Sequence, residues 1–187
     1  MAKKRIIIGI SGASGSVLGV ALLEAFRDRA DWETHLIMTH GAEVTLGYET
    51  DRSPDAVKAL ADVAYSIDDL AASVSSGTFR TEGMIIAPCS MKTAAGIACG
   101  YAENLLLRAA DVVIKERRRL LLIPRESPLS TIHLRNLLAL SELGAFILPP
   151  MPAFYQKPAD VNDIVKHVTG RALDHFGIET DFFRPWG

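Results

Sequence analysis

Short apolar runs alternate along the chain with longer segments of helical periodicity. The first run, residues 6–10, is continuously apolar and ends in a turn rich in glycine and serine. Such runs predict strands buried on both faces, at residues 6–10, 34–39, 83–87, 120–123 and 145–148. The segments between them predict helices, at residues 17–29, 42–49, 94–100, 102–116, 131–143 and 160–176, with a further helix starting at Ser53-Pro54. The polar stretch 67–81 predicts a long surface loop.

The alternation of strands and helices has no internal repeat and no linker, which is typical of a parallel sheet covered on both faces. We therefore expect residues 1–187 to form a single α/β domain. It should be a Rossmann-like (flavodoxin-like) three-layer sandwich with a mostly parallel sheet. In such sheets the ligand binds at the carboxyl ends of the strands. The turns after the strands therefore predict that Ser14, Thr39, Ser90 and Arg125 converge on one crevice.

The turn after the first predicted strand has the composition of an anion-binding loop. Gly9, Gly12, Gly15 and Gly19 are separated by gaps of three, three and four residues. A strand, a tight turn and a helix start would aim free N–H groups and the positive end of a helix dipole at a phosphate. The spacing matches neither G-x-G-x-x-G nor a P-loop, so a mononucleotide such as FMN fits better than NAD or ATP. A plain turn with small residues for close packing is the alternative at this point.

The turn at residues 88–93 is the second informative stretch. Ser90 and Thr93 supply hydroxyls where a helix begins, which predicts another anion or flavin-edge cradle. Ser90 taken alone is equally well explained as a helix N-cap. Cys89 has no histidine beside it, and we expect a buried, inert thiol.

Four cationic residues are candidates for binding a phosphate. Arg108 and Lys115 are seven residues apart and lie on the same face of one predicted helix. Arg125 follows a strand end, and Arg171 lies in the last predicted helix. Cations near the end of a parallel sheet suit a phosphate, which arginine binds through two parallel hydrogen bonds.

Two carboxylates are candidates for proton transfer. Glu49 and Glu126 follow elements that should end near the crevice, and either could be a general acid or base if desolvation raised its pKa. The five histidines form no metal-binding pattern, and two cysteines cannot complete a structural zinc site.

Composition narrows the class of protein. The net charge of -2 argues against a large nucleic-acid footprint. No segment reaches the roughly 18 apolar residues of a membrane helix. Two cysteines in a chain of this size make no disulfide framework, and a reducing cytoplasm is the expected location.

Several longer motifs together resemble one family. The matching segments are GISGASG at 9–15, YETD at 48–51, PCSMKTAAGIACG at 88–100, RAADVVIKERR at 108–118, PRESPLSTIHLRNLLALSELGA at 124–145, PPMPAFYQKP at 149–158 and RPW at 184–186. With the spacing between them they cover nearly the whole length, and the third and fifth are long and specific. On these residues the chain resembles the flavin prenyltransferases of the UbiX/Pad1 type.

The resemblance implies an activity and its partners. The family transfers the dimethylallyl group of dimethylallyl monophosphate to N5 and C6 of reduced FMN, without a metal. Its product, prenylated FMN, serves UbiD-type decarboxylases. The resemblance also implies a homo-oligomer, expected to be a dodecamer.

The resemblance also implies roles for individual residues. The flavin-binding positions are Gly12, Ala13, Ser14, Thr39, Ser90, Met91, Lys92, Thr93 and Arg125, and Thr39 stands where the family commonly has serine. The positions that bind the prenyl phosphate are Lys115, Arg125, Glu126, Tyr155 and Arg171. The catalytic positions are Ser14 and Glu49 as a proton relay near flavin N5, with Lys115, Glu126, Arg108 and Trp186. Trp186 should arrive with the tail, residues 177–187, across a subunit interface.

Two other functions compete with this one. An FMN-dependent cysteine decarboxylase would need a catalytic histidine after the second strand, and His40 stands near that position. A flavin carrier would deliver FMN to a decarboxylase without any chemistry of its own.

Overall fold

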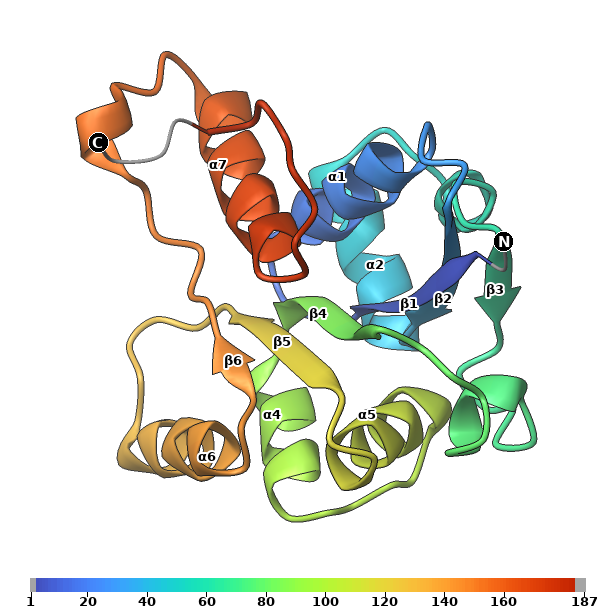
Figure 1. Cartoon of the computed structure of the whole chain (residues 1–187). Helices are drawn as coiled ribbons and strands as arrows, with labels where there is room; N and C mark the ends of the chain where they lie inside the picture. Colours follow the sequence, from blue (N-terminus) through green and yellow to red (C-terminus); the bar gives the residue numbers. More distant parts are fainter. Residues whose placement is uncertain (1–2, 184–187) are drawn as a thin grey trace.

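The computed structural model describes residues 3–183, which form one six-stranded sheet with helices on both faces (Figure 1). The strands are β1 (Lys4–Ile10), β2 (Trp32–Met38), β3 (Val63–Tyr65), β4 (Gly83–Cys89), β5 (Arg119–Pro124) and β6 (Phe146–Ile147). The helices are α1 (Ser16–Phe26), α2 (His40–Glu49), α3 (Pro54–Lys58), α4 (Met91–Ala98), α5 (Leu105–Lys115), α6 (Thr131–Glu142) and α7 (Val161–Asp174), with short 3-10 turns η1 (Ser73–Ser75) and η2 (Phe154–Gln156).

The strand order is β3-β2-β1-β4-β5-β6, and each neighbouring pair is parallel. Figure 1 shows α1, α2 and α7 on one face of the sheet and α4 and α5 on the other, with α6 beside α4. The predicted α/β, Rossmann-like fold with a parallel sheet is therefore confirmed.

The structure adds one strand to those predicted and shifts the starts of two helices by three residues. The strand β3 was not predicted, because three residues at a sheet edge are too few to give a readable pattern. Helix α4 begins three residues earlier than expected, at Met91, directly after its cap Ser90. Helix α5 begins later, at Leu105, because the side chain of Asn104 accepts a hydrogen bond from the Leu107 N–H at 3.0 Å and caps the helix there.

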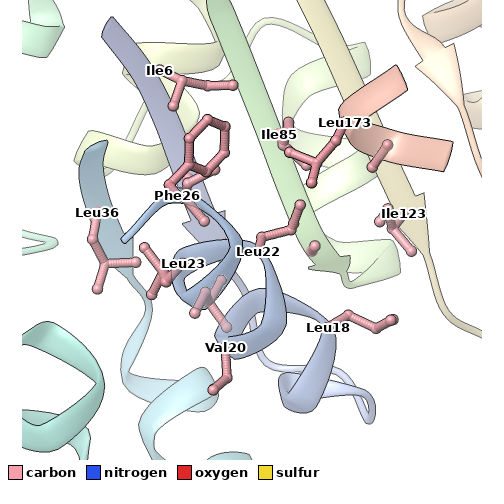
Figure 2. Close-up of a cluster of buried hydrophobic side chains, with 14 of the residues drawn as sticks. Ile6, Leu18, Val20, Leu22, Leu23, Phe26, Leu36, Ile85, Ile123 and Leu173 are labelled. Atoms are coloured by element: carbon pink, nitrogen blue, oxygen red, sulfur yellow. The ribbon is translucent and has the colours of Figure 1, made fainter. Parts of the chain in front are cut away.

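The strands are apolar on both faces because each face meets a helical layer. In β1, Ile6 and Ile8 belong to the core beneath α1 and α7, whereas Ile7 belongs to the core beneath α4 and α5. Figure 2 shows Leu22 of α1 in the first of these cores, together with Ile6 of β1 and Ile85 of β4. Burial of each such side chain contributes about 1.5–3 kcal/mol, so the sheet is stabilised from both sides.

The strands β1 and β4 are neighbours at the point where the strand order reverses. The chain leaves β1 for a helix on one face and leaves β4 for a helix on the other, so the two loops diverge and open a crevice. Buried Ser11 ties the two loops together. Its hydroxyl donates to the Pro88 carbonyl at 2.9 Å and accepts from the Ser90 N–H at 2.7 Å.

Helix α1 comes so close to the sheet that Gly19 has no room for a side chain. A Cβ at Gly19 would lie 2.5 Å from the Ala87 carbonyl oxygen and 2.7 Å from the Ile10 side chain. In α2, by contrast, a Cβ at Gly47 would have nothing within 4 Å. Substitution by alanine at Gly47 therefore tests helix propensity alone, whereas the same substitution at Gly19 also tests the packing of α1 against the sheet.

We expect Gly19→Ala to lower the free energy of unfolding by about 1–3 kcal/mol, since overpacking outweighs the better helix propensity of alanine. The control Gly47→Ala should raise it by about 0.5–1 kcal/mol. Urea titration followed by circular dichroism measures both. A Gly19→Ala protein as stable as the wild type would contradict the close approach of α1 to the sheet.

Candidate active site

A pocket of about 660 Å³ opens at the switch point, at the carboxyl ends of β1, β2 and β4. It brings together seven of the predicted site residues: Gly12, Thr39, Ser90, Met91, Lys92, Thr93 and Glu126. Predicted flavin-binding residue Ala13 lies in the same loop as Gly12. Pockets for ligands of drug size are typically 300–1,000 Å³, so this one can hold a mononucleotide.

The start of α4 supplies a group of hydrogen-bond donors to this pocket. The Ser90 hydroxyl accepts from the Thr93 N–H at 3.2 Å and donates to the Thr93 hydroxyl at 3.0 Å, which caps the helix. The N–H groups of Met91 and Lys92 lie in the first turn, where helix geometry provides no intrahelical acceptor. Together with the helix dipole they favour an anion at this end of the pocket.

The opposite wall is built from two glycine-bearing loops. Thr39 caps α2, its hydroxyl accepting from the Ala42 N–H at 3.1 Å. A Cβ on Gly12 would lie 3.0 Å from the backbone of Gly41, so the two loops approach closely only because Gly12 has no side chain. Both loops thereby expose their backbones to the pocket.

The start of α1 is not the open phosphate cradle that the sequence predicts. The Glu49 carboxylate, from the end of α2, accepts hydrogen bonds from the N–H groups of Gly15 and Ser16 at 2.9 and 2.8 Å. It also accepts one from the Ser16 hydroxyl. Gly15 is the N-cap of α1 and makes no side-chain cap of its own, so Glu49 takes that role. The expected phosphate position is therefore occupied by a carboxylate of the protein itself.

The same contacts fix the ionisation of Glu49. Partial burial raises its pKa, but hydrogen bonds from the Ser14 and Ser16 side chains and from the N–H groups of Ser16 and Gly15 outweigh burial, and the net pKa is lowered. The condition under which the sequence made Glu49 a candidate acid or base, a pKa raised by desolvation, is therefore not met. Glu49 is held as an anion, which suits accepting a proton rather than donating one.

Ser14 and Arg125 line a smaller pocket, of about 160 Å³, between the start of α1 and α7. The crevice predicted for Ser14, Thr39, Ser90 and Arg125 is thus divided: Thr39 and Ser90 line the large pocket, and Ser14 and Arg125 the small one. The loop at 11–15 separates the two.

Tyr155 of η2 and Arg171 of α7 line neither the large nor the small pocket. Tyr155 lines a third pocket, of about 540 Å³, and stacks edge-on against His167 with ring centroids 6.4 Å apart. Arg171 lies one turn beyond His167 on α7, pairs with Asp174 at 3.0 Å, and its guanidinium lies 5.5 Å from the centroid of the Phe183 ring.

Helix α5 carries Arg108 in its first half and Lys115 at its last residue, and neither lines the large pocket, to which Glu126 belongs. Helix α5 begins at the large pocket, which Leu107 lines. It ends shortly before β5 begins, at the amino-terminal ends of the strands. There the Lys115 ammonium donates to Glu116 at 2.6 Å. Arg108, part-way along, pairs with Asp111 at 2.8 Å and donates to the Ser75 carbonyl at 3.2 Å. Trp186 lies outside the described residues.

Several pocket residues were in no site prediction. Asp68 lies 3.5 Å from His40, and Glu103 lies 3.7 Å from Lys92, so a histidine–carboxylate contact and a Lys92–Glu103 ion pair flank the rim. These acids come from loops without a recognisable motif, and only the fold places them here. By contrast, Cys89 is as predicted: it is fully buried, and burial raises the pKa of its thiol to about 12.

Within residues 3–183, no group of three or more His, Cys, Asp and Glu side chains is arranged to hold a metal ion. Among the same residues, none of the helices has the length and apolar character needed to cross a bilayer.

The sheet order and the switch-point pocket define a Rossmann-like protein of the flavoprotein class, and comparison with known proteins agrees. A family model described as Flavoprotein matches residues 1–173. The chain is 56% identical over 182 residues to a "Probable UbiX-like flavin prenyltransferase" of Escherichia coli O157:H7, covering 97% of this chain and 92% of the relative. The chain belongs to the UbiX-like flavin prenyltransferase family and is a transferase.

Solved structures support the same assignment. A dodecameric FMN-dependent UbiX-like decarboxylase from Escherichia coli O157:H7 matches with a TM-score of 0.96 at 56% identity, over 98% of this chain and 99% of that one. AnUbiX (PadA1), solved in complex with FMN and dimethylallyl pyrophosphate, matches with a TM-score of 0.96 at 50% identity, over 99% and 98%. The FMN-dependent cysteine decarboxylase SpaF, 19% identical with a TM-score of 0.66 over 82% and 87%, shares the fold alone.

The lowered pKa of Glu49 makes its contribution to stability depend on pH. A carboxyl whose pKa is lower folded than unfolded stabilises the fold above its ordinary value of 4.5, and the contribution disappears as the pH falls through the lowered pKa. We expect Glu49→Gln to lower the free energy of unfolding at neutral pH and to differ less from the wild type near pH 3. Urea titrations at both pH values measure this.

The matched control is Glu142→Gln, a change at an exposed position in the last turn of α6. It should shift stability little at either pH. A deficit of Glu49→Gln that is the same at neutral pH and near pH 3 would contradict an ionised cap on α1.

Proposed function

We propose that this chain joins the dimethylallyl group of dimethylallyl monophosphate to N5 and C6 of reduced FMN, and that a UbiD-type decarboxylase receives the prenylated FMN. Membership of the flavin prenyltransferase family supports the reaction class, and the AnUbiX complex with FMN and dimethylallyl pyrophosphate supports FMN and a dimethylallyl phosphate ester as the two substrates. The observation that carries the proposal is the large switch-point pocket, which has an anion cradle at α4 and lies beside the loop that contains Ser14 and that is bound by Glu49 of α2.

The residues of the large pocket fit FMN. The FMN phosphate would bind at the start of α4, where the Ser90 and Thr93 hydroxyls and the N–H groups of Met91 and Lys92 converge. Thr39 and the Gly12 backbone would face the flavin from the opposite wall. Reduced FMN supplies the nucleophilic ring atoms N5 and C6, and the protein supplies binding, orientation and charge.

The predicted roles of the charged side chains follow from the chemistry of the leaving group. A monophosphate leaves poorly unless its charge is neutralised, which Lys115, Arg125 and Arg171 would do, with Tyr155 as a further contact. Glu126 would supply a proton to the departing phosphate. Glu49 would accept the proton lost when the new ring closes, because its lowered pKa keeps it ionised and it contacts Ser14.

We also propose that several copies of the chain complete each site. Within one chain, Lys115 lies at the amino-terminal ends of the strands, whereas Glu126 lies at their carboxyl ends. A phosphate site that contains both Lys115 and Glu126 therefore needs α5 of another copy. The dodecameric relative supports a homo-oligomer. So do large apolar side chains exposed on α6, among them Ile132 and Leu138. The tail with Trp186 would reach the site in the same way.

Turnover distinguishes this function from its two rivals. Reduced FMN, dimethylallyl monophosphate and the protein should yield a flavin heavier by one C5H8 unit, detected by mass spectrometry. Glu49→Gln should bind FMN as the wild type does but form product roughly 10²–10⁴-fold more slowly, because a general base contributes about that factor. Product formation at the wild-type rate in this variant would favour a carrier. Cysteine decarboxylation without a prenylated flavin would favour the decarboxylase.

Mixing inactive variants tests the shared site. Lys115→Ala and Glu126→Gln should each lower kcat/KM at least about tenfold. After dissociation and reassembly together, some sites receive an intact α5 from one variant and Glu126 from the other, and activity should return in part. A mixture of Lys115→Ala with Arg108→Ala, both on α5, should stay inactive. If neither mixture regains activity, the site is not shared between copies.

A further inference from the structure

The side chain of His35, in the middle of β2, is buried and does not line the large pocket. Its ring stacks on that of Tyr65 with centroids 5.8 Å apart and meets the Phe79 ring edge-on at 5.0 Å. The Nε2 atom lies 2.8 Å from a Glu33 carboxylate oxygen, and the Nδ1 atom lies 2.9 Å from the Tyr65 hydroxyl. A buried imidazole with both nitrogens paired fixes the orientation of its partners.

The ionisation of His35 and Glu33 sets the direction of these hydrogen bonds. Burial lowers the pKa of His35 and outweighs the opposing contact with Glu33, so the ring is neutral at neutral pH. Burial raises the pKa of Glu33, but hydrogen bonds from His35 and Arg5 outweigh it, and the net pKa is lowered. The ionised carboxylate can only accept. The Nε2–H of His35 therefore donates to Glu33, and Nδ1 accepts from the Tyr65 hydroxyl.

The same hydrogen bonds continue from Tyr65 to the turn η1. The Tyr65 hydroxyl oxygen lies 2.9 Å from the Ser73 Oγ atom. Since the Tyr65 O–H is directed at His35, the Ser73 hydroxyl donates to the Tyr65 oxygen. Ser73 is the exposed first residue of η1, whereas Val74 is 1% exposed and belongs to the core beneath α4 and α5. Val74 thus holds the inner side of η1, and Tyr65 holds its outer side.

The last residue of η1 contacts Arg108 of α5. The Ser75 carbonyl accepts from the Arg108 Nε atom at 3.2 Å, and the Asp111 carboxylate accepts from a terminal nitrogen of the same guanidinium at 2.8 Å. A planar guanidinium held by two acceptors at different nitrogens has a fixed orientation, which Asp111 alone would not provide. The orientation of Arg108 therefore depends on the place of η1, which packs against α5.

We propose that His35 and Tyr65 are positioning residues for Arg108. Through Ser73 they fix η1, and the Ser75 carbonyl then sets the orientation of the Arg108 guanidinium. The inference rests on the proposed function, in which Arg108 is one of the catalytic residues.

Removing single hydroxyl groups tests this connection with little change in packing. Tyr65→Phe and Ser73→Ala should each lower kcat/KM for flavin prenylation at least about threefold, since residues in one hydrogen-bond network are coupled by at least about that factor. The matched control is Ser76→Ala in the same loop, whose hydroxyl contacts Thr78 and not Tyr65. This control should leave kcat/KM unchanged. Wild-type turnover in both Tyr65→Phe and Ser73→Ala would overturn the inference.

A double-mutant cycle separates positioning of Arg108 from a general effect on the fold. In the Arg108→Ala protein, the residual kcat/KM is measured over longer reaction times. Adding Tyr65→Phe to this protein should lower it no further, because the side chain that Tyr65 positions is absent. If Tyr65→Phe causes the same loss with and without Arg108, Tyr65 does not act through Arg108 and the inference is overturned.

Hydrogen exchange tests the structural part without turnover. The N–H groups of Ser75 and Ser76 donate to the carbonyls of Ala72 and Ser73 within η1. Mass spectrometry of peptides covering residues 72–76 should show faster exchange in Tyr65→Phe than in the wild type. If the wild type forms no prenylated flavin, the proposed function fails. Exchange then still decides whether Tyr65 fixes η1: faster exchange in Tyr65→Phe supports it, and unchanged exchange overturns it.

Discussion

The hydrogen bonds between the Glu49 carboxylate and the first turn of α1 determine how the rest of the site can work. A helix start beside a glycine turn normally offers its free N–H groups to a ligand phosphate. Here a side chain from the end of α2 accepts the hydrogen bonds of Gly15 and Ser16, so a ligand phosphate has to bind elsewhere. The start of α4, across the same crevice, has the free donors and the hydroxyls for it. The contact between Glu49 and the start of α1 thus caps α1 and keeps the Glu49 carboxylate ionised beside the crevice. It also leaves the start of α4 as the place where a ligand phosphate can bind.

The charges that the proposed chemistry needs are spread widely over the fold. Arg125 follows β5 and Arg171 lies on α7. Lys115 is the last residue of α5, at the amino-terminal ends of the strands. In the proposed function these charges would converge on one phosphate where copies of the chain meet. Assembly would then also remove water from the site, which strengthens each electrostatic contact. Oligomerisation and catalysis would in this way depend on the same surfaces.

The local features of the fold could be predicted from the sequence. The continuous apolar runs predict buried parallel strands, and the cap at Ser53-Pro54 predicts the start of α3. Ser90 has both of the roles that the sequence left open, since it caps α4 and also lines the large pocket. Seven of the fourteen residues that line the large pocket were among the predicted site residues.

Contacts between distant residues could not be predicted in the same way. Glu49 is 34 residues from Gly15 in the sequence. Ser11 is 79 residues from Ser90, whose N–H donates a hydrogen bond to the Ser11 hydroxyl. The glycine turn was correctly recognised as the start of a helix, but its partner could not be read from the turn itself. The position of Lys115 likewise depends on the direction in which α5 packs, although its face of the helix follows from the sequence.

The most direct test of this account is the position of the phosphate in a crystal structure of the protein with FMN. The account predicts phosphate oxygens within hydrogen-bond distance of the first turn of α4, near Ser90 and Thr93, with Glu49 still bound to the start of α1. A phosphate bound at Gly15 and Ser16, with Glu49 displaced, would contradict it.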